Sequence, residues 1–252
     1  MNLLALQADG LEIAYIAVGI LLGIAVVGAL IAQIVVIVGY WRGNRTQNSL
    51  GISGGEFARK LLDEDGLQEV QVKKCTLLRT LLFGNHYSIA RKTVFLRIMT
   101  INKASVTSVA IAAQKVALAE QHRDGNKKMI VRGRLQGLGV FAPSLFLPLV
   151  IAGILLDLFV FENLFMTVIV LILGILFVIF AFVVTILNIP VEKSAMQRAS
   201  EMLGAYLTAE EMSMVKKVYR SYLIEYVMQF IVALLRLIQL ILKAILAVRK
   251  NR

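Results

Sequence analysis

Cysteine and histidine are almost absent from this sequence of 252 residues, which has one cysteine, Cys75, and two histidines, His86 and His122. A disulfide framework and a cysteine-based zinc cluster are excluded, because each requires several cysteines. Two imidazoles leave few candidate groups for metal or acid–base chemistry, and neither histidine has an evident acidic partner for a serine hydrolase. No Walker or dinucleotide-binding motif is present.

Long apolar segments dominate the sequence. The sequence is 58% hydrophobic with a mean hydropathy of +0.77, which is typical of a membrane protein. Lys and Arg number 27 against 16 Asp and Glu, giving a net charge of +11. We interpret this excess as topological, because basic residues collect on the cytoplasmic side of a membrane protein. No nucleic-acid-binding motif accompanies the charge, so nucleic acid is not an expected partner.

Three apolar segments are long enough to cross a bilayer as helices: 14–40, 141–161 and 164–187. The first could instead be a cleaved signal peptide, but it lacks a basic leading region and is too long. Residues 1–41 are therefore predicted to form an N-terminal transmembrane helix, and residues 139–189 a transmembrane hairpin. The sequence Asn188-Ile-Pro190 is predicted to end the third span.

Residues 42–138 form the largest polar section, with 17 Lys and Arg against 7 Asp and Glu, a local charge of +10. This section is predicted to be cytoplasmic and α+β. Ser53-Gly-Gly-Glu56 is a capping box that begins a helix, residues 69–75 and 93–98 are strand candidates, and residues 105–121 are a helix rich in small residues.

Residues 190–252 are predicted to form a cytoplasmic helix followed by an amphipathic one. The segment 222–248 is apolar enough to span, but its polar residues share one face, and spanning would leave the terminal basic residues outside. An amphipathic helix at the inner interface is the preferred interpretation, and a fourth span is the alternative. The fold class is thus a helical integral membrane protein with three spans, an amphipathic C-terminal helix and a small α+β element.

Several motifs, in order and at matching spacing, resemble the YugP-like neutral zinc metallopeptidases of bacterial membranes. Residues 51–67 are similar to the opening of that family, and His86-Tyr87 to its H-Y-D-P element. Ala112-Ala-Gln-Lys-Val-Ala-Leu-Ala-Glu-Gln121 is similar to its A-A-H-E-V-G-H-A-x-Q helix, and Ile189-Pro-Val-Glu192 to its L-P-V-E segment. The resemblance implies a zincin-like element in residues 42–138 and, for the family, a zinc cofactor.

The sequence departs from the family's motifs at the positions that carry the family's chemistry. The resemblance places Gln114 and Leu118 where the family has its two zinc-binding histidines, and Lys115 where it has its catalytic Glu. Glu192 is retained as the family's implied third ligand, and His86 from the H-Y-D-P element; we regard both as a vestigial site. Leu118 cannot coordinate a metal and Lys115 is cationic where a base is needed, so no catalytic residue, metal site or cofactor is predicted.

The remaining candidates have simpler interpretations. Lys115 is expected to pair with Glu192 in place of the metal, unless both side chains reach water separately. His122 is expected at the surface, His86 in a local hydrogen bond, and Cys75 in the core.

These features favour a catalytically inactive homologue acting as a structural or regulatory subunit in the bacterial cytoplasmic membrane. Expected partners are the lipid bilayer and other membrane subunits, including an active paralogue. A working zinc peptidase with a non-standard site and a lipid-interacting scaffold are the alternatives.

Overall fold

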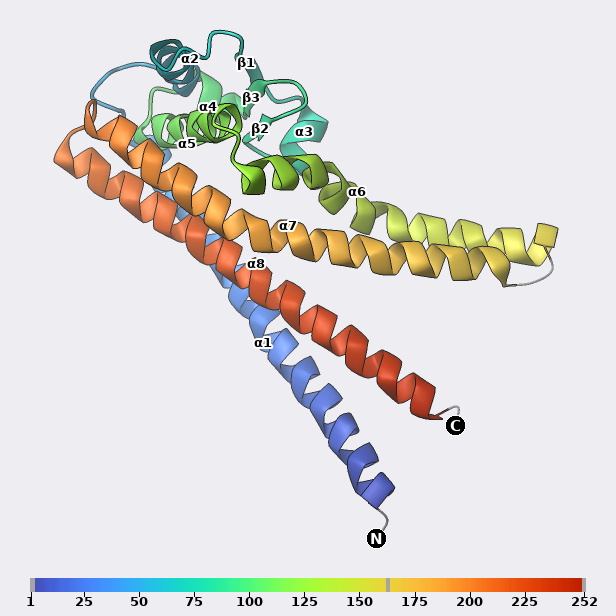
Figure 1. The fold of residues 1–252 in the computed structure, drawn as a ribbon. Coiled ribbons are helices and arrows are strands. Elements are labelled where there is room, and N and C mark those ends of the chain that lie inside the picture. Colours follow the sequence, from blue (N-terminus) through green and yellow to red (C-terminus); the bar gives the residue numbers. More distant parts are fainter. Residues whose placement is uncertain (1–2, 162–163, 251–252) are drawn as a thin grey trace.

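The computed structural model describes residues 3–161 and 164–250, which form long helices and one small sheet (Figure 1). The elements are α1 (Leu3–Arg45), α2 (Gly54–Glu64), β1 (Gln71–Lys74), α3 (Leu77–Leu82), β2 (His86–Ser88), β3 (Thr93–Leu96), α4 (Ile98–Asn102), α5 (Val106–Arg123), α6 (Lys127–Leu156), a π-helical turn (Asp157–Phe161), α7 (Phe165–Gly204) and α8 (Ala209–Lys250). The link between the second and third predicted spans, at 162–163, lies outside the described residues.

The chain is a helical membrane protein. Among the described residues, α1, α7 and α8 are long and apolar enough to cross a bilayer, and the end of α6 adds a shorter apolar stretch, Pro148–Phe161. Many apolar side chains of these helices are exposed, as expected for helices that contact lipid: Ile20 and Ile24 of α1, for example, are 61% and 65% exposed. Of the predicted second span, residues 138–147 are outside the part whose side chains are described.

The long helices associate in two antiparallel pairs that diverge from a common base (Figure 1). Helix α8 runs along α1, and α7 runs along α6. The segment 222–248 therefore lies beside the first span. This packing favours the alternative of a membrane-crossing segment. The interfacial helix preferred from the sequence is less consistent with it.

The helix that contains the predicted third span does not end at Pro190. Helix α7 continues through Pro190 to Gly204. A proline inside a helix removes one backbone hydrogen bond, but the following turns are held by burial: Val191, Ala195, Ala199 and Leu203 are at most 1% exposed. These residues belong to the same apolar core as α5, and that packing keeps the helix continuous.

At the common base lies a compact head, which we define as residues 46–136 with the parts of α7 and α8 packed on it. Its sheet has the order β1-β3-β2, with β1 parallel and β2 antiparallel to β3. Helix α5 is its centre, and every residue from Val106 to Glu120 is buried. Small side chains let α2, α7 and the sheet approach α5 closely, which confirms the predicted small-residue helix.

The capping box at Ser53 is present as predicted: its hydroxyl accepts from the Glu56 amide, and the Glu56 carboxylate accepts from the Ser53 amide. The adjacent glycine is needed for packing. A Cβ atom on Gly54 would lie 2.3 Å from the Thr100 carbonyl oxygen and 2.8 Å from the Ser108 carbonyl oxygen.

Gly54→Ala should therefore destabilise the head. Overpacking against backbone costs about 1–3 kcal/mol, which corresponds to a fall of about 5 °C in the unfolding temperature of a protein this size. Differential scanning fluorimetry in detergent measures it. Gly204→Ala is the matched control, because nothing lies within 4 Å of a Cβ there; equal effects in both variants would show that the close approach is unimportant.

Candidate functional site

Helix α5 presents Gln114 and Lys115 toward the part of α7 that carries Glu192. Gln114 donates from Nε2 to Glu192 Oε2 at 2.7 Å, and Lys115 Nζ lies 3.3 Å from the same oxygen. About two turns further on, Gln121 donates to the Val191 carbonyl and to Ser194 Oγ, which fixes α7 against α5. The predicted pairing of Lys115 with Glu192 is confirmed.

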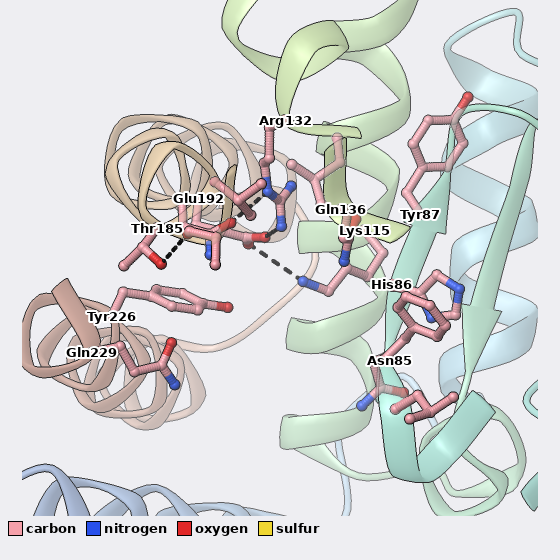
Figure 2. A pocket seen from close by; sticks show the side chains of 16 residues that line it. Asn85, His86, Tyr87, Lys115, Arg132, Gln136, Thr185, Glu192, Tyr226 and Gln229 are labelled. Carbon is pink, nitrogen blue, oxygen red and sulfur yellow. Dashed lines mark hydrogen bonds and ion pairs between the residues drawn. The ribbon is translucent and has the colours of Figure 1, made fainter. Parts of the chain in front are cut away.

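A second cation completes the arrangement. Arg132 of α6 donates from Nη2 to Glu192 Oε1, and its Nε donates to Asn188 Oδ1 at 2.6 Å (Figure 2). We call Lys115, Arg132 and Glu192 the charged triad. Each carboxylate oxygen of Glu192 therefore has a cation as partner.

The charged triad is almost completely buried: the side chains of Lys115, Arg132 and Glu192 are 7%, 8% and 1% exposed. Burial lowers the pKa of the Lys115 ammonium, the Glu192 carboxylate opposes that change, and Arg132 adds to it. With Lys115 and Arg132 both protonated, the two cations and one carboxylate give the triad a formal charge of +1.

A family model described as "Putative neutral zinc metallopeptidase" matches residues 18–245. The chain belongs to this family. The protein named "Putative membrane protease YugP" from Bacillus subtilis (strain 168) is 26% identical to it over 201 residues, which cover 79% of this chain and 84% of that protein. No solved structure matches the chain. The resemblance drawn from the sequence motifs is thereby confirmed at the level of the family.

The residues at the centre of this zinc metallopeptidase homologue do not fit a zinc ion. Structural and catalytic zinc sites take at least three donors from Cys, His, Asp and Glu. At the positions assigned to the family's ligands the chain has an amide, a fully buried isobutyl group at Leu118 and the carboxylate of Glu192. That carboxylate is engaged by Lys115 and Arg132 on its two oxygens, so it is not available to a cation without displacing both.

His86 lies near the charged triad but takes part in other contacts. Its Nδ1 lies 3.0 Å from the Gly84 carbonyl oxygen, and its ring stacks on Phe95 with centroids 5.0 Å apart. The predicted local hydrogen bond of a strand-edge histidine is confirmed, since β2 is an edge strand. The side chain lines a cavity together with Lys115, Arg132 and Glu192.

Burial lowers the pKa of His86 and the nearby cations Arg79, Lys115 and Arg132 lower it further, while the Gly84 hydrogen bond raises it. The folded state then binds fewer protons than the unfolded state below the ordinary histidine pKa of about 6.5, so stability falls as the pH falls. The drop in unfolding temperature between pH 7.5 and 5.5 should be smaller in His86→Asn than in the natural protein. Equal drops would show that His86 is not a source of this pH dependence.

The other histidine, His122, and the cysteine, Cys75, can also be compared with their predicted positions. His122, predicted at the surface, is half-buried, and its Nδ1 lies 2.9 Å from the Tyr87 hydroxyl oxygen. This contact was not predicted, because Tyr87 is 35 residues away in sequence and is brought beside α5 by β2. Cys75 is buried as predicted, at 5% exposure.

The residues Gly51–Gly55 have the G-x-S-x-G spacing of a nucleophile elbow. The structural context is different, because Ser53 follows no strand and its hydroxyl accepts a hydrogen bond from the amide of Glu56, the third residue of α2. Ser53 is a helix cap.

The residue that sequence reasoning missed is Arg132. Residues 127–136 form a basic amphipathic segment before the second span, a pattern in which arginine commonly faces solvent. The available signal was weak: Arg132 lies four residues from both Lys128 and Gln136, and no motif in this segment points to α7.

Proposed function

We propose that this protein is a catalytically inactive member of its metallopeptidase family, and that it acts as a structural or regulatory subunit in a membrane protein complex. The observation that supports the proposal is the charged triad. Lys115 and Arg132 engage Glu192 where the family resemblance places the metal and the catalytic base. A cross-link between α5, α6 and α7 that a metal would supply is supplied here by side chains.

The chemistry of hydrolysis is the second argument. A metallopeptidase needs a polarised water and a general base near it. Lys115 is a donor without an acceptor while it is charged, and Gln114 donates its amide to Glu192. Neither group can take a proton from water in this arrangement.

Membrane anchoring and orientation extend the proposal. The head is proposed to lie on the cytoplasmic side of the bacterial inner membrane, because residues 42–138 carry the local charge of +10. Its partners would be lipid and other membrane subunits, including an active paralogue; the exposed apolar surfaces of α1 and α7 are available to both.

Peptide cleavage by the purified protein tests the proposal. In detergent with added zinc, the natural protein should cleave an unfolded protein substrate no faster than Glu192→Gln does. Zinc-dependent cleavage that is lost in Glu192→Gln would establish the competing function, an active peptidase with a non-standard site. The subunit role predicts a defined stoichiometric partner after extraction in mild detergent; a solitary chain would contradict it.

A further inference from the structure

A polar cavity of about 380 Å³ adjoins the charged triad, between the head and helices α6, α7 and α8. This volume is in the range of small-molecule binding sites. Figure 2 shows Tyr226 of α8 with its hydroxyl directed into this space, and Asn85, next to β2, lies at its edge. The cavity therefore brings two buried cations together with neutral polar groups from three other elements.

The charges around this cavity are unbalanced. The triad has one residual positive charge, because both carboxylate oxygens of Glu192 are already paired, one with Lys115 and the other with Arg132. Glu225 lines a neighbouring cavity together with Arg97 and Lys115, and there its carboxylate accepts a hydrogen bond from Gln229. A buried charge without a partner is unfavourable, so an anionic group in the cavity would stabilise the triad.

One face of α7 changes from apolar to charged as it approaches the head. Ala181, Val184, Asn188 and Glu192 follow one another at helical spacing, and all four line the cavity. Toward the membrane the same face of α7 continues with apolar side chains, the half-buried Phe177 and the exposed Leu173. A ligand that matches this gradient has an anionic head beside Arg132 and an apolar tail along α7.

Helix α3 indicates where the bilayer surface meets the head. Leu77, Leu78 and Leu81 are 79%, 66% and 75% exposed, and the next residues, Leu82 and Phe83, line the cavity. Figure 1 places α3 beside the start of α6, on the side of the head from which the α6–α7 pair extends. Exposed leucines at that place suit the boundary between lipid headgroups and acyl chains.

We propose that this cavity binds the phosphodiester headgroup of an anionic membrane phospholipid. Lys115 and Arg132 donate to the phosphate oxygens, as charge-assisted hydrogen bonds favour, and the acyl chains lie along α7. The single negative charge of the phosphodiester balances the residual charge of the triad. A peptide carboxylate has the same charge, but its backbone amides would meet Ala181 and Val184 without hydrogen-bond partners. The inference rests on the proposed absence of a metal at Glu192.

The test uses the full chain in detergent, with matched phosphatidylglycerol and phosphatidylcholine in equal amounts, and native mass spectrometry to count retained lipid. The natural protein should retain one phosphatidylglycerol in about tenfold preference, because the choline ammonium would add a positive charge beside the triad. Lys115→Met leaves Arg132 paired with Glu192 in a neutral site, so the preference should fall about tenfold. Glu192→Gln leaves two cations, so the preference should rise.

Lys193→Met is the matched control, because it removes one positive charge from an exposed position next to Glu192. It should keep the preference of the natural protein. Arg132→Gln is the second test variant, with the same expected loss as Lys115→Met. Equal retention of both lipids by the natural protein, or an equal loss in Lys193→Met, would overturn the lipid site.

Two further results separate this inference from the proposed function. Retention of a short peptide with a free C-terminal carboxylate, in place of either lipid, would overturn the lipid site and identify a peptide site. Zinc-free protein that does not discriminate between the lipids would overturn the lipid site alone. Stoichiometric zinc in the same sample would overturn the proposed function.

Discussion

Glu192→Gln should lower the unfolding temperature by about 10 °C. The substitution removes the carboxylate that Lys115 and Arg132 share and leaves two buried cations side by side. Removing one partner of a buried ion pair costs about 3–5 kcal/mol, and each kcal/mol corresponds to about 2–4 °C in a protein of this size. The unfolding temperature in detergent, followed by fluorescence, measures the effect.

A double-mutant cycle shows whether the pairing is the cause. Lys115→Met alone should cost less than Glu192→Gln, because Arg132 continues to pair with the carboxylate. The double variant Lys115→Met/Glu192→Gln should be less destabilised than the sum of the single effects, because one of the stranded cations is gone. Strict additivity would show that Lys115 and Glu192 do not interact. Glu201→Gln, at an exposed ion pair on the same helix, is the control and should change little.

Restoring the family's motif should create a zinc site. The triple variant Gln114→His/Lys115→Glu/Leu118→His places two imidazoles four residues apart on one face of α5, opposite Glu192, with a carboxylate beside the first. We expect about one zinc ion per chain, measured by mass spectrometry of the purified protein after removal of loosely bound metal. The effect is large, since the natural donor set does not fit the ion.

Arg132 is expected to compete with zinc for Glu192 in that variant. Adding Arg132→Leu should therefore tighten zinc binding, because the carboxylate is released. The single variant Leu118→His is the control, with one imidazole and one carboxylate, and should bind no stoichiometric zinc. If the triple variant and its Arg132→Leu form both fail to bind zinc while remaining folded, the frame around Glu192 does not have the geometry that the family resemblance implies.

Sequence patterns predicted the parts of this fold that depend on local chemistry. The capping box at Ser53, the helix that begins after Ser105 and the buried Cys75 follow from hydrogen-bonding groups and burial preferences close together in the chain. The continuity of α7 through Pro190 was not predicted, because burial against α5 outweighs the local helix-breaking tendency of proline.

The candidate site was predicted in part. The Lys115–Glu192 pair could be anticipated because the family resemblance placed both residues at one centre. Arg132 joins from α6, and Tyr87 meets His122 through β2, so both contacts depend on the packing of elements far apart in sequence. The position of α8 beside α1 has the same origin, since hydropathy alone does not distinguish a packed span from an interfacial helix.

The metal content of the purified natural protein tests the central claim most directly. Elemental mass spectrometry on protein extracted in detergent and exchanged into zinc-containing buffer, then freed of loosely bound metal, should find far less than one zinc per chain. One zinc per chain, lost when Glu192 is replaced by glutamine, would contradict the account.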